Sequence, residues 1–490
     1  MLKVCTYIIV FSLSSLLNRT ANCQNKIGIG SGERDIAYSM CEYNDIYYIV
    51  GTTCDNYKSP ANYYVLQLFK NGGIKNEFVF GEPHQDVGKD IIVNDNGIYV
   101  LGKTWDGGYT NNDMLLSKLN FSGDRQWKKY YGGDRNNLGH KMTELADGNF
   151  AMVGFNQTVE SFGNVYIVKV NDVGEIIWEN NFGDSYIDYG FDVTEDLNGN
   201  IYIAGTYGGF YSPTSNDYKN PDADIFIIKT NANGEEIWSK RYGGAGHDWA
   251  KNIINAPDGS FIICGSSQSE GSGSFDAFLM KIDDNGNEIW FKTYGGPEFE
   301  YGEQVQLSSD NCLYMISTSA SFSGDYSTDH YLVKTDINGN EIWSQNYGST
   351  ESDYSSSLIC TADSGCVFTG WTKNGQIGKE DIVFYKIAKN GDQEILSLVP
   401  PVNDSIEQIL IYPNPIHDRL FVEIKTDSSD TFSLHLFSMK GNEVYFGNIH
   451  PNSKSEHYPS ISNGVYIFTI TQNSQLVQKG KLIVNSDFQP

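Results

Sequence analysis

The sequence has few basic residues, and this shortage excludes two classes of partner. Lysine and arginine number 34 against 61 aspartates and glutamates, giving a formal net charge of -27. Nucleic-acid binding needs clustered basic side chains that replace the counterions of the phosphate backbone. Anionic membrane surfaces also attract basic segments. The composition therefore argues against nucleic acid and against an anionic lipid surface as partners.

Long apolar runs are missing beyond the N-terminus. Residues 1–23 have the layout of a secretory signal peptide: the basic residue Lys3 near the start, then the apolar run YIIVFSLSSLL, then a polar stretch. We place cleavage after Cys23, which makes Gln24 the first mature residue; the alternative is a lipoprotein with a lipidated Cys23. No later stretch holds about 18 consecutive apolar residues, so we expect no transmembrane segment in the mature chain.

Cysteine is scarce, and no Cys/His spacing resembles a zinc site. After removal of Cys5 and Cys23, six of the eight cysteines remain. An exported protein can oxidise its thiols, and Cys360 and Cys366 flank a hairpin-like loop, TADSG, so a cross-strand disulfide is one alternative for this pair. The other four are equally compatible with small buried apolar side chains. They are Cys41, Cys54, Cys264 and Cys312.

What the sequence does contain is one phrase repeated along the chain. It reads NGEEIWSKRYG at 233–243, NGNEIWFKTYG at 285–295 and NGNEIWSQNYG at 338–348. Positions equivalent to its tryptophan recur at intervals of 49 to 60 residues, which gives seven units. These positions are Phe78, Trp127, Trp178, Trp238, Trp290, Trp343 and Ile395. Repeats of this length indicate an array, a solenoid or a propeller.

Each unit has the same internal order, shown well by residues 246–296. The alternating stretch AKNIINA reaches a PDG turn, and the apolar run SFIICG returns from it. After a variable loop, DAFLMKID goes out, and EIWFKTYG comes back beyond a DNGN turn. Such runs predict a four-stranded antiparallel meander, and seven meanders bury their faces by packing radially. We therefore predict an all-β protein whose residues 24–398 form a seven-bladed β-propeller.

These units resemble the bacterial seven-bladed β-propeller repeat. The segments YGGAGHDWAKNIINAPDGSFIICG and FGDSYIDYGFDVTEDLNGNIYIAG carry its pattern of glycines and acidic residues. The resemblance implies a fold but no activity, because propellers serve many roles. We interpret the repeated phrase as scaffold. Asn-Gly supplies the positive φ of the outer hairpin, the tryptophan fills the gap between blades, and Tyr-Gly-Gly lets the chain cross to the next blade.

Function should then depend on the segments in which the units differ. The loops after the second strand vary most, and geometry places them on the same face as the crossovers between blades. They contain aromatic side chains among Ser, Asn, Asp and Gly, a mixture suited to recognition of sugar rings or protein. We predict that this face binds an extracellular glycan or protein; the alternative is that the aromatics pack their own loops. The aromatic residues are Tyr57, Trp105, Tyr109, Phe155, Phe162, Tyr207, Tyr211, Tyr218, Tyr326 and Trp371.

One position on the predicted face is regular. The residues that start the inner strand are acidic in six units: Asp35, Asp86, Asp188, Asp248, Glu300 and Asp353, with Asn137 in the remaining unit. Several oxygens near the axis are the ligands that a hard cation such as Ca²⁺ prefers. The alternative is that each carboxylate caps its own turn by accepting backbone N–H bonds. No other cofactor is indicated.

Evidence for catalysis is weak in this sequence. Arg34, Arg125, Arg135 and Arg241 fall at different repeat positions and form no sialidase-type cluster. His84, His140 and His247 lie near crossovers without a recognisable nucleophile motif. Paired carboxylates for glycoside cleavage stay open in so acidic a chain.

The repeat ends before residue 399, and a different module follows a linker at 399–408. Residues 409–490 alternate apolar and polar side chains, as a small β-sandwich does. They resemble the C-terminal sorting domain of the type IX secretion system of Bacteroidota through YPNP, the MKGNEV turn, NGVYIFTI and KGKLIV. The matching residues are Tyr412, Pro413, Asn414, Pro415, Gly441, Gly464, Tyr466 and Lys481.

This second resemblance implies passage through the periplasm, export by the type IX machinery, and a secreted or cell-surface location. The sequence thus predicts an exported propeller that displays a binding face. The alternatives are a surface polysaccharide hydrolase or lyase, and a structural component of an adhesive surface layer.

Overall fold

The structure is a computed structural model, and its described residues contain strands and turns. These residues are 27–29, 34–54, 61–81, 85–105, 112–133, 135–157, 163–184, 187–208, 222–323, 327–373, 379–394, 406–412, 419–426, 431–438, 443–457, 461–472 and 475–484. The propeller and the C-terminal strands are two units, described separately below.

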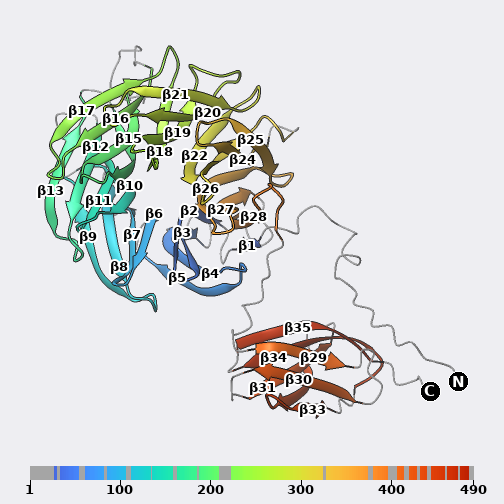
Figure 1. Ribbon diagram of the computed structural model, residues 1–490. Helices are drawn as coiled ribbons and strands as arrows, with labels where there is room; N and C mark the ends of the chain where they lie inside the picture. Colours follow the sequence, from blue (N-terminus) through green and yellow to red (C-terminus); the bar gives the residue numbers. More distant parts are fainter. Residues whose placement is uncertain are drawn as a thin grey trace. The chain divides into compact units, whose positions relative to one another are not determined.

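Seven blades form the propeller, and Figure 1 shows them following one another around a ring in chain order; a single parallel bridge between Arg34 and Glu380 joins blades 1 and 7 into one sheet. The first three blades are antiparallel meanders of four strands each. Blade 1 contains β2 (Arg34–Tyr43), β3 (Ile46–Cys54), β4 (Asn62–Phe69) and β5 (Ile74–Phe80). Blade 2 contains β6 (Asp86–Asn94), β7 (Gly97–Trp105), β8 (Asn112–Leu119) and β9 (Arg125–Tyr131). Blade 3 contains β10 (Asn137–Glu144), β11 (Phe150–Asn156), β12 (Asn164–Val170) and β13 (Ile176–Phe182).

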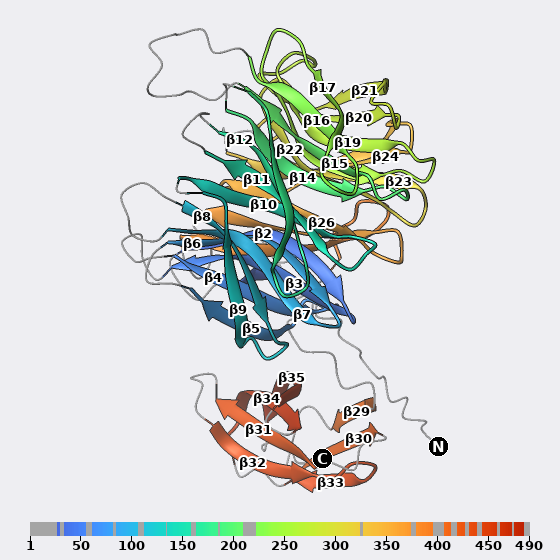
Figure 2. The same ribbon diagram turned by 90° about the vertical axis from the view of Figure 1, so that its left-hand side faces the viewer.

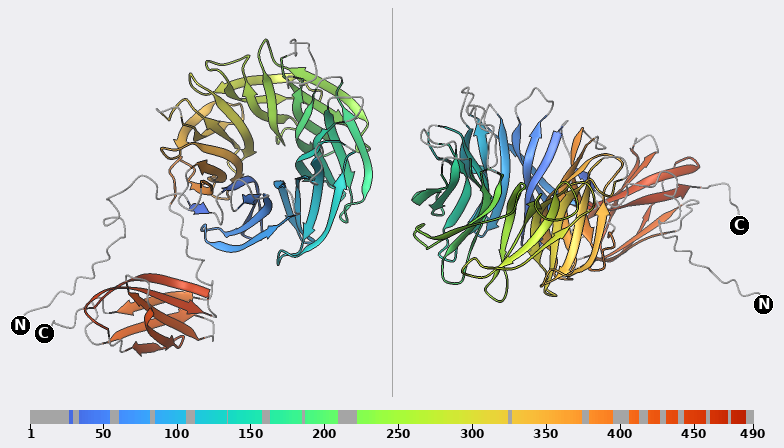
Figure 3. Two further views of the ribbon diagram at one scale, coloured as in Figure 1. Left: turned by 180° about the vertical axis from the view of Figure 1, so that it is seen from behind. Right: turned by 90° about the horizontal axis from the view of Figure 1, so that it is seen from above.

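The next three blades repeat this order, and the view from behind in Figure 3 shows the same ring. Blade 4 contains β14 (Tyr189–Glu195), β15 (Ile201–Tyr207), β16 (Asp224–Thr230) and β17 (Glu236–Tyr242). Blade 5 contains β18 (Asp248–Asn255), β19 (Phe261–Ser267), β20 (Asp276–Ile282) and β21 (Glu288–Tyr294). Blade 6 contains β22 (Glu300–Leu307), β23 (Cys312–Ser319), β24 (Asp329–Asp336) and β25 (Glu341–Tyr347). The predicted seven-bladed propeller is confirmed.

Blade 7 is completed by the other end of the propeller chain. Its strands β26 (Asp353–Cys360), β27 (Cys366–Lys373) and β28 (Glu380–Ile387) pair in order, and β28 then pairs antiparallel with β1 (Ile27–Ile29). The ring is therefore closed by backbone hydrogen bonds between residues more than three hundred positions apart. The repeat did not predict this pairing. It places the outer strand of the last unit around Ile395, which lies outside the described residues.

The repeated phrase forms the contact between neighbouring blades. The tyrosine hydroxyl that ends one outer strand donates to the carbonyl of the turn glycine in the next blade: Tyr131 to Gly174 at 2.8 Å, Tyr242 to Gly286 at 2.6 Å, Tyr294 to Gly339 at 2.7 Å and Tyr347 to Gly391 at 2.6 Å. The tryptophan of the phrase lies against the same turn, and its indole N–H donates to a carbonyl there in Trp178 (3.1 Å to Ala232) and Trp238 (3.3 Å to Asp284). Tryptophan, tyrosine and Asn-Gly are three parts of one contact.

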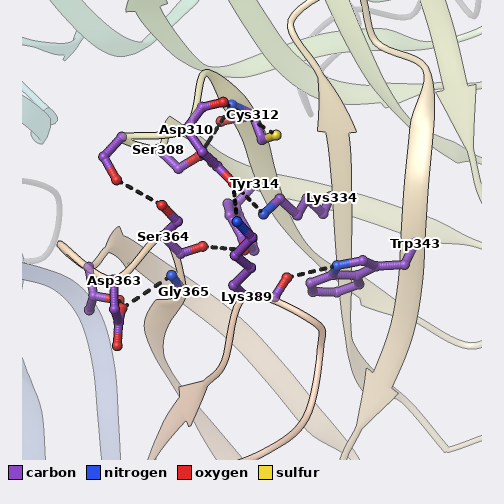
Figure 4. Close-up of polar contacts among 12 residues, drawn as sticks. Ser308, Asp310, Cys312, Tyr314, Lys334, Trp343, Asp363, Ser364, Gly365 and Lys389 are labelled. Carbon is purple, nitrogen blue, oxygen red and sulfur yellow. Dashed lines mark hydrogen bonds and ion pairs between the residues drawn. The ribbon is translucent and has the colours of Figure 1, made fainter.

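A close-up of blades 6 and 7 shows how this contact continues along the interface (Figure 4). The indole N–H of Trp343 donates to the carbonyl of Lys389 at 3.2 Å. The hydroxyl of Tyr314 donates to the carbonyl of Ser364 in the next blade at 2.7 Å. Within blade 6, buried Lys334 pairs with Asp310 of the first turn at 3.1 Å. Turns and strands of two blades are thus held by polar contacts to backbone carbonyls.

The C-terminal unit is a sandwich of two sheets (Figure 2). One sheet has the order β29-β30-β33 and the other the order β32-β31-β34-β35. A continuous apolar core lies between them, formed by alternate residues of β30, β31 and β34 together with Ile449, Leu482 and Val484. The strands are β29 (Ile406–Tyr412), β30 (Leu420–Thr426), β31 (Phe432–Ser438), β32 (Glu443–Ile449), β33 (Lys454–His457), β34 (Gly464–Gln472) and β35 (Gln475–Val484). The predicted sandwich is confirmed.

Replacement of Gly286 by alanine should weaken blade 5 more than the same replacement at Gly259. Both glycines have positive φ, +72° and +81°, so both substitutions carry the backbone cost of about 1–2 kcal/mol. A Cβ on Gly286 meets the Trp238 ring of the preceding blade at 2.9 Å, whereas a Cβ on Gly259 meets nothing within 4 Å. Overpacking should add about 1–3 kcal/mol for Gly286→Ala, measured by denaturant unfolding. Equal losses for the two variants would contradict the contact.

Candidate functional site

The inner strands of the blades share one burial pattern. In β18, β22 and β26 the first six residues alternate as buried, half-buried, buried, half-buried, buried and buried. The second and fourth residues of the inner strand are therefore the ones that face the central channel. The acidic position singled out in the sequence is the first residue, which is buried.

A β-bulge lies at the fourth residue of the pattern in six of the inner strands. In β18, for example, Ala250 pairs with Gly265 and Asn252 with Cys264, so Lys251 has no partner on the second strand. The same register shift occurs at Lys89, His140, Phe191, Glu303 and Ser356. A bulge leaves one residue unpaired and changes the direction of its side chain. Each blade thus directs one side chain toward the axis.

These bulge residues line one cavity of about 180 Å³. All seven blades contribute: the residues at this position are Tyr38, Lys89, His140, Phe191, Lys251, Glu303 and Ser356. Four residues that follow them in the chain, Lys141, Asp192, Asn252 and Gln304, complete the wall. We call this space the axial cavity. Its chemistry is mixed, because identical scaffold positions carry a different residue type in each blade.

The lysines of the axial cavity lie over aromatic rings of the preceding blade. The ammonium of Lys89 is 3.7 Å from the centroid of the Tyr38 ring, and that of Lys251 is 4.1 Å from the centroid of Phe191. Burial, together with the positive charges of Lys103 and Lys251, lowers the pKa of Lys89 to about 7. Burial likewise lowers the pKa of Lys103. The ammonium groups of Lys103 and Lys251 therefore destabilise the protonated form of Lys89.

The acidic and imidazole groups of the cavity are also shifted by burial. Burial lowers the pKa of His140 to about 3, so its ring is neutral, and its Nδ1–H donates to the carbonyl of Gly190 at 2.8 Å. Burial raises the pKa of Asp192 to about 6 and that of Glu303 above its usual range, although Lys251 and Lys89 oppose the shift of Glu303. Burial disfavours the ammonium of Lys141, but the carboxylates of Asp90 and Asp192 outweigh it and raise that pKa.

The residue after the bulge links one blade to the next at five of the junctions. Asp192 accepts from the backbone N–H of Ile253 at 2.9 Å, and Asn252 accepts from that of Val305 at 2.9 Å. The same contact joins Asp90 to Met142 at 2.8 Å, Gln304 to Leu358 at 2.7 Å and Ser357 to Met40 at 3.2 Å. The chain of contacts includes the junction of blades 7 and 1. The bulge therefore gives two consecutive residues different roles. The bulge residue lines the axial cavity, and the residue after it accepts a hydrogen bond from the next blade.

Four aromatic side chains occupy the second position of the inner strands in adjacent blades. They are Tyr189, Trp249, Tyr301 and Tyr354, from blades 4 to 7, and all four are half-buried. We call them the aromatic arc. The rings of Trp249 and Tyr301 are 6.0 Å apart across the blade junction, and Phe275 lies 4.8 Å from Trp249. The arc thus presents partly exposed rings over four blades.

The aromatic arc is continuous with the axial cavity. The ring of Tyr189 lies 6.0 Å from His140 and 5.8 Å from Phe191, both of which line the cavity. His140 and Phe191 are themselves stacked at 5.0 Å. A ligand lying on the arc would therefore meet the cavity wall at blade 4.

The loop aromatics predicted from the sequence are partly described. Trp371 stacks on Tyr354 of the arc at 4.1 Å between centroids, and Phe155 stacks on Tyr189 at 4.6 Å. Trp105 is 37% exposed at the end of β7. Tyr207 is buried, donates its hydroxyl to Asp184 and lies 3.6 Å from the guanidinium of Arg241. The others lie outside the described residues: Tyr57, Tyr109, Phe162, Tyr211, Tyr218 and Tyr326.

Loops and crossovers do lie at the same end of the blades. The backbone N–H of Gly208, after β15, donates to Asp188 at the start of β14 at 2.9 Å. In blade 5 the hydroxyl of Ser269 donates to Asp248 at 2.5 Å. The loops and crossovers share one end as the sequence predicts, and ligand binding by that face stays a prediction; the aromatic arc was not singled out in the sequence. The signal was present, since each arc residue directly follows one of the regular acidic positions.

The regular acidic residues are fully buried and hydrogen-bonded within the loops of this face. Asp188 accepts from the backbone N–H of Asp184 at 3.1 Å, Glu300 from that of Gly296 at 2.9 Å and Asp353 from that of Ser349 at 2.7 Å. Asp35 and Asp86 are buried at equivalent positions. Within the described ranges, no three His, Cys, Asp or Glu side chains come together as metal ligands. Calcium binding by this ring stays a prediction.

The remaining residues singled out in the sequence are placed as follows. Cys360 and Cys366 lie directly opposite each other on β26 and β27, and all six described cysteines are free thiols. His247 accepts the backbone N–H of Ala223 on Nδ1 at 3.0 Å, and His140 lines the axial cavity. Residues 1–26, with the predicted signal peptide, His84 and residues 395–405 lie outside the described residues.

Part of the predicted sorting signal lies in the described strands of the C-terminal sandwich. Gly464 begins β34, and Tyr466 is buried in the core with its hydroxyl donating to the carbonyl of Ser462 at 2.8 Å. Tyr412 ends β29, and Lys481 pairs with Ile467. Pro413, Asn414, Pro415 and Gly441 lie outside the described residues.

Residues 410–485 match the family model described as the secretion system C-terminal sorting domain. The chain carries a type IX secretion sorting domain. This sorting domain directs the propeller through the type IX machinery to the cell surface or the medium. Among the residues that the structure describes, no helix has the length and apolar character needed to cross a membrane.

The other comparisons give weaker likenesses. The regulatory protein FlaEY of Caulobacter vibrioides is 25% identical over 179 residues, which are 32% of this chain and 19% of that protein; the chain thus spans about a fifth of that relative. The WD40 domain of Neurospora crassa Pan2 is 11% identical, with 75% of this chain and 92% of that chain covered at a TM-score of 0.45. A puromycin hydrolase is 9% identical, with 90% and 59% covered at 0.48.

Gln304→Ala should destabilise the ring, because it leaves the backbone N–H of Leu358 buried without its acceptor. The expected loss is about 1–3 kcal/mol in the free energy of unfolding. Gln306→Ala, two residues along the same strand at a half-buried position, is the matched control and should cost less. Denaturant titrations of both variants measure the difference. Similar losses would show that the contact from Gln304 to Leu358 does not fasten the blades.

Proposed function

We propose that the exported propeller is a binding protein for an extracellular saccharide, and that the sugar rings stack on the aromatic arc. The observation that carries this proposal is the arc itself: four half-buried aromatic rings at one repeat position in adjacent blades, next to the axial cavity. Scaffold positions in this protein carry the same residue type in most blades. The second position of the inner strand is Ile36, Val87 and Leu138 in blades 1 to 3 and aromatic in blades 4 to 7.

Half-buried aromatic side chains suit a ligand with alternating apolar faces and hydroxyl edges. Aromatic rings bury large apolar areas at a small cost in conformational entropy, and their polar tips stay hydrated. Tyr301 and Tyr354 carry hydroxyl groups, and Trp371 extends the stacked surface beside Tyr354. A loop of a protein partner is the competing ligand for such a surface.

Binding without turnover is favoured by the condition of the carboxylates. Glycoside cleavage generally needs two carboxyl groups that can act on one bond. In the axial cavity, Asp192 already accepts from Asn252 Nδ2 at 2.5 Å and from the backbone of Ile253, so it serves the blade junction. Glu303 is then the remaining carboxyl group among the lining residues.

Loss of the arc should abolish binding while the fold persists. The exported protein is tested against an array of extracellular polysaccharides, and bound ligands are then assayed for cleavage products. The double variant Trp249→Ala/Tyr301→Ala should lose affinity by about 5- to 150-fold, since each stacked ring contributes about 0.5–1.5 kcal/mol. Tyr130→Ala, which removes an exposed ring from an outer strand, should change nothing. Retention of a protein but of no saccharide would reject the proposed ligand class, and product formation would reject pure binding.

Deletion of residues 409–490 should trap the propeller in the periplasm. The sorting domain has its own core, so its removal leaves the seven blades intact. Fractionation of cells that express the full and the truncated chain measures the location. Normal export of the truncated chain would contradict the role of the domain in sorting.

A further inference from the structure

We infer that the axial cavity binds an oxyanion, namely a carboxylate, sulfate or phosphate group, between Lys89 and Lys251. The inference concerns the interior of the channel, and its core holds whether or not a saccharide occupies the aromatic arc. Its extension, that the anionic group belongs to an acidic saccharide, rests on the function proposed above.

The two lysines share the cavity with the carboxyl group of Glu303, and no salt bridge neutralises either ammonium within the described residues. Both stand at bulge positions, so the fold directs their side chains toward the axis. Each ammonium lies over an aromatic ring, which orients it and leaves its charge in place. Among the described residues, neither lysine forms a salt bridge, whereas Lys141 in the same wall pairs with Asp90 at 2.8 Å.

The positive charge in this layer exceeds the negative charge. The charges of Lys103 and Lys251 act on Lys89, all three lysines act on the neutral His140, and Glu303 is the carboxyl group that Lys89 and Lys251 face. The adjoining layer holds Asp90, Lys141 and Asp192, which bond to one another and to backbone groups. The chain has a net charge of -27, so its composition alone would predict more carboxylates than ammonium groups at this place. Such an excess is stabilised by a bound anion.

The volume and the donors fit a small anion. A space of about 180 Å³ is below the size of typical ligand pockets, about 300–1,000 Å³, so it takes a functional group with a few waters and excludes a whole oligosaccharide. Ammonium donors form short charge-assisted hydrogen bonds to carboxylate, sulfate and phosphate oxygens. Ser356 and Gln304 in the wall supply further polar groups.

The competing interpretation is that the lysines only pack against their aromatic neighbours. Sulfate separates the two, because its charge stays constant over the range in which Lys89 titrates. Isothermal titration of the exported protein with sodium sulfate, against sodium chloride at equal ionic strength, should show one site. Binding should weaken as the pH rises through about 7, because Lys89 loses its proton while Asp192 and Glu303 become more negative. Titrations in buffers of different ionisation enthalpy should show proton uptake near pH 7.

Three variants make the result decisive. Lys251→Met should lower sulfate affinity by at least about tenfold, the effect of losing one charge-assisted contact. Glu303→Gln should raise sulfate affinity, an outcome that damage to the fold does not produce. Lys75→Met, on an outer strand, is the matched control and should be neutral. Sulfate binding that equals chloride binding, or that is unchanged in both cavity variants, would overturn the inference.

Two further arms separate this inference from the proposed function and identify the source of the anion. Trp249→Ala should still bind sulfate, so failure of saccharide binding leaves the anion result intact. Acetate, sulfate and phosphate are compared at one pH, and the tightest of them indicates a uronic acid, a sulfate ester or a phosphate as the natural group. Equal failure of all three would reject an oxyanion site.

Discussion

The β-bulge in the inner strands of blades 2 to 7 is the constraint on which the rest of this propeller depends. In a regular strand, successive side chains point to opposite faces of the sheet. The extra residue of the bulge interrupts this alternation once in each of these six strands. The bulge residue then faces the cavity, and the residue after it faces the neighbouring blade. Lys251 faces the cavity while Asn252 fastens blade 5 to blade 6. Without the bulge, the same sequence would lose either its cavity lining or its junction.

The outer end of each blade solves a different problem with the repeated phrase. Trp238, Tyr242 and the turn at Gly286 form one contact, in which two side-chain donors reach carbonyls of a tight turn. Because the turn glycine has a positive φ and touches the indole, tryptophan, tyrosine and glycine recur together in the contacts made by blades 2, 4, 5 and 6, whereas blade 1 carries Phe78 at the tryptophan position. This is why the phrase is uniform, whereas the residues toward the axis vary from blade to blade.

Much of the fold could be predicted from the sequence. Turn residues and apolar runs are local signals, so the seven blades and the sorting domain with Gly464 and Tyr466 followed from them. Closure of blade 7 by residues 27–29 could not be predicted, because a long-range strand exchange leaves no local pattern. The bulges could not be predicted either, because no local sequence pattern marks the unpaired residue. Attention therefore went to the variable loops, and the arc at Trp249 and the lysines of the axial cavity were missed although their spacing is regular.

The propeller thus combines an acidic chain with two lysines in the wall of the axial cavity, Lys89 and Lys251, that form no salt bridge with any described residue. The residues that recur in most blades form the contacts between blades. The second and fourth residues of the inner strands differ between blades and determine which side chains line the channel. The most direct measurement is anomalous diffraction from crystals of the exported protein soaked in selenate, whose selenium marks an oxyanion. The expected result is a peak in the axial cavity between Lys89 and Lys251. Selenate peaks confined to the outer surface, with none in the cavity, would contradict a binding site at the axis.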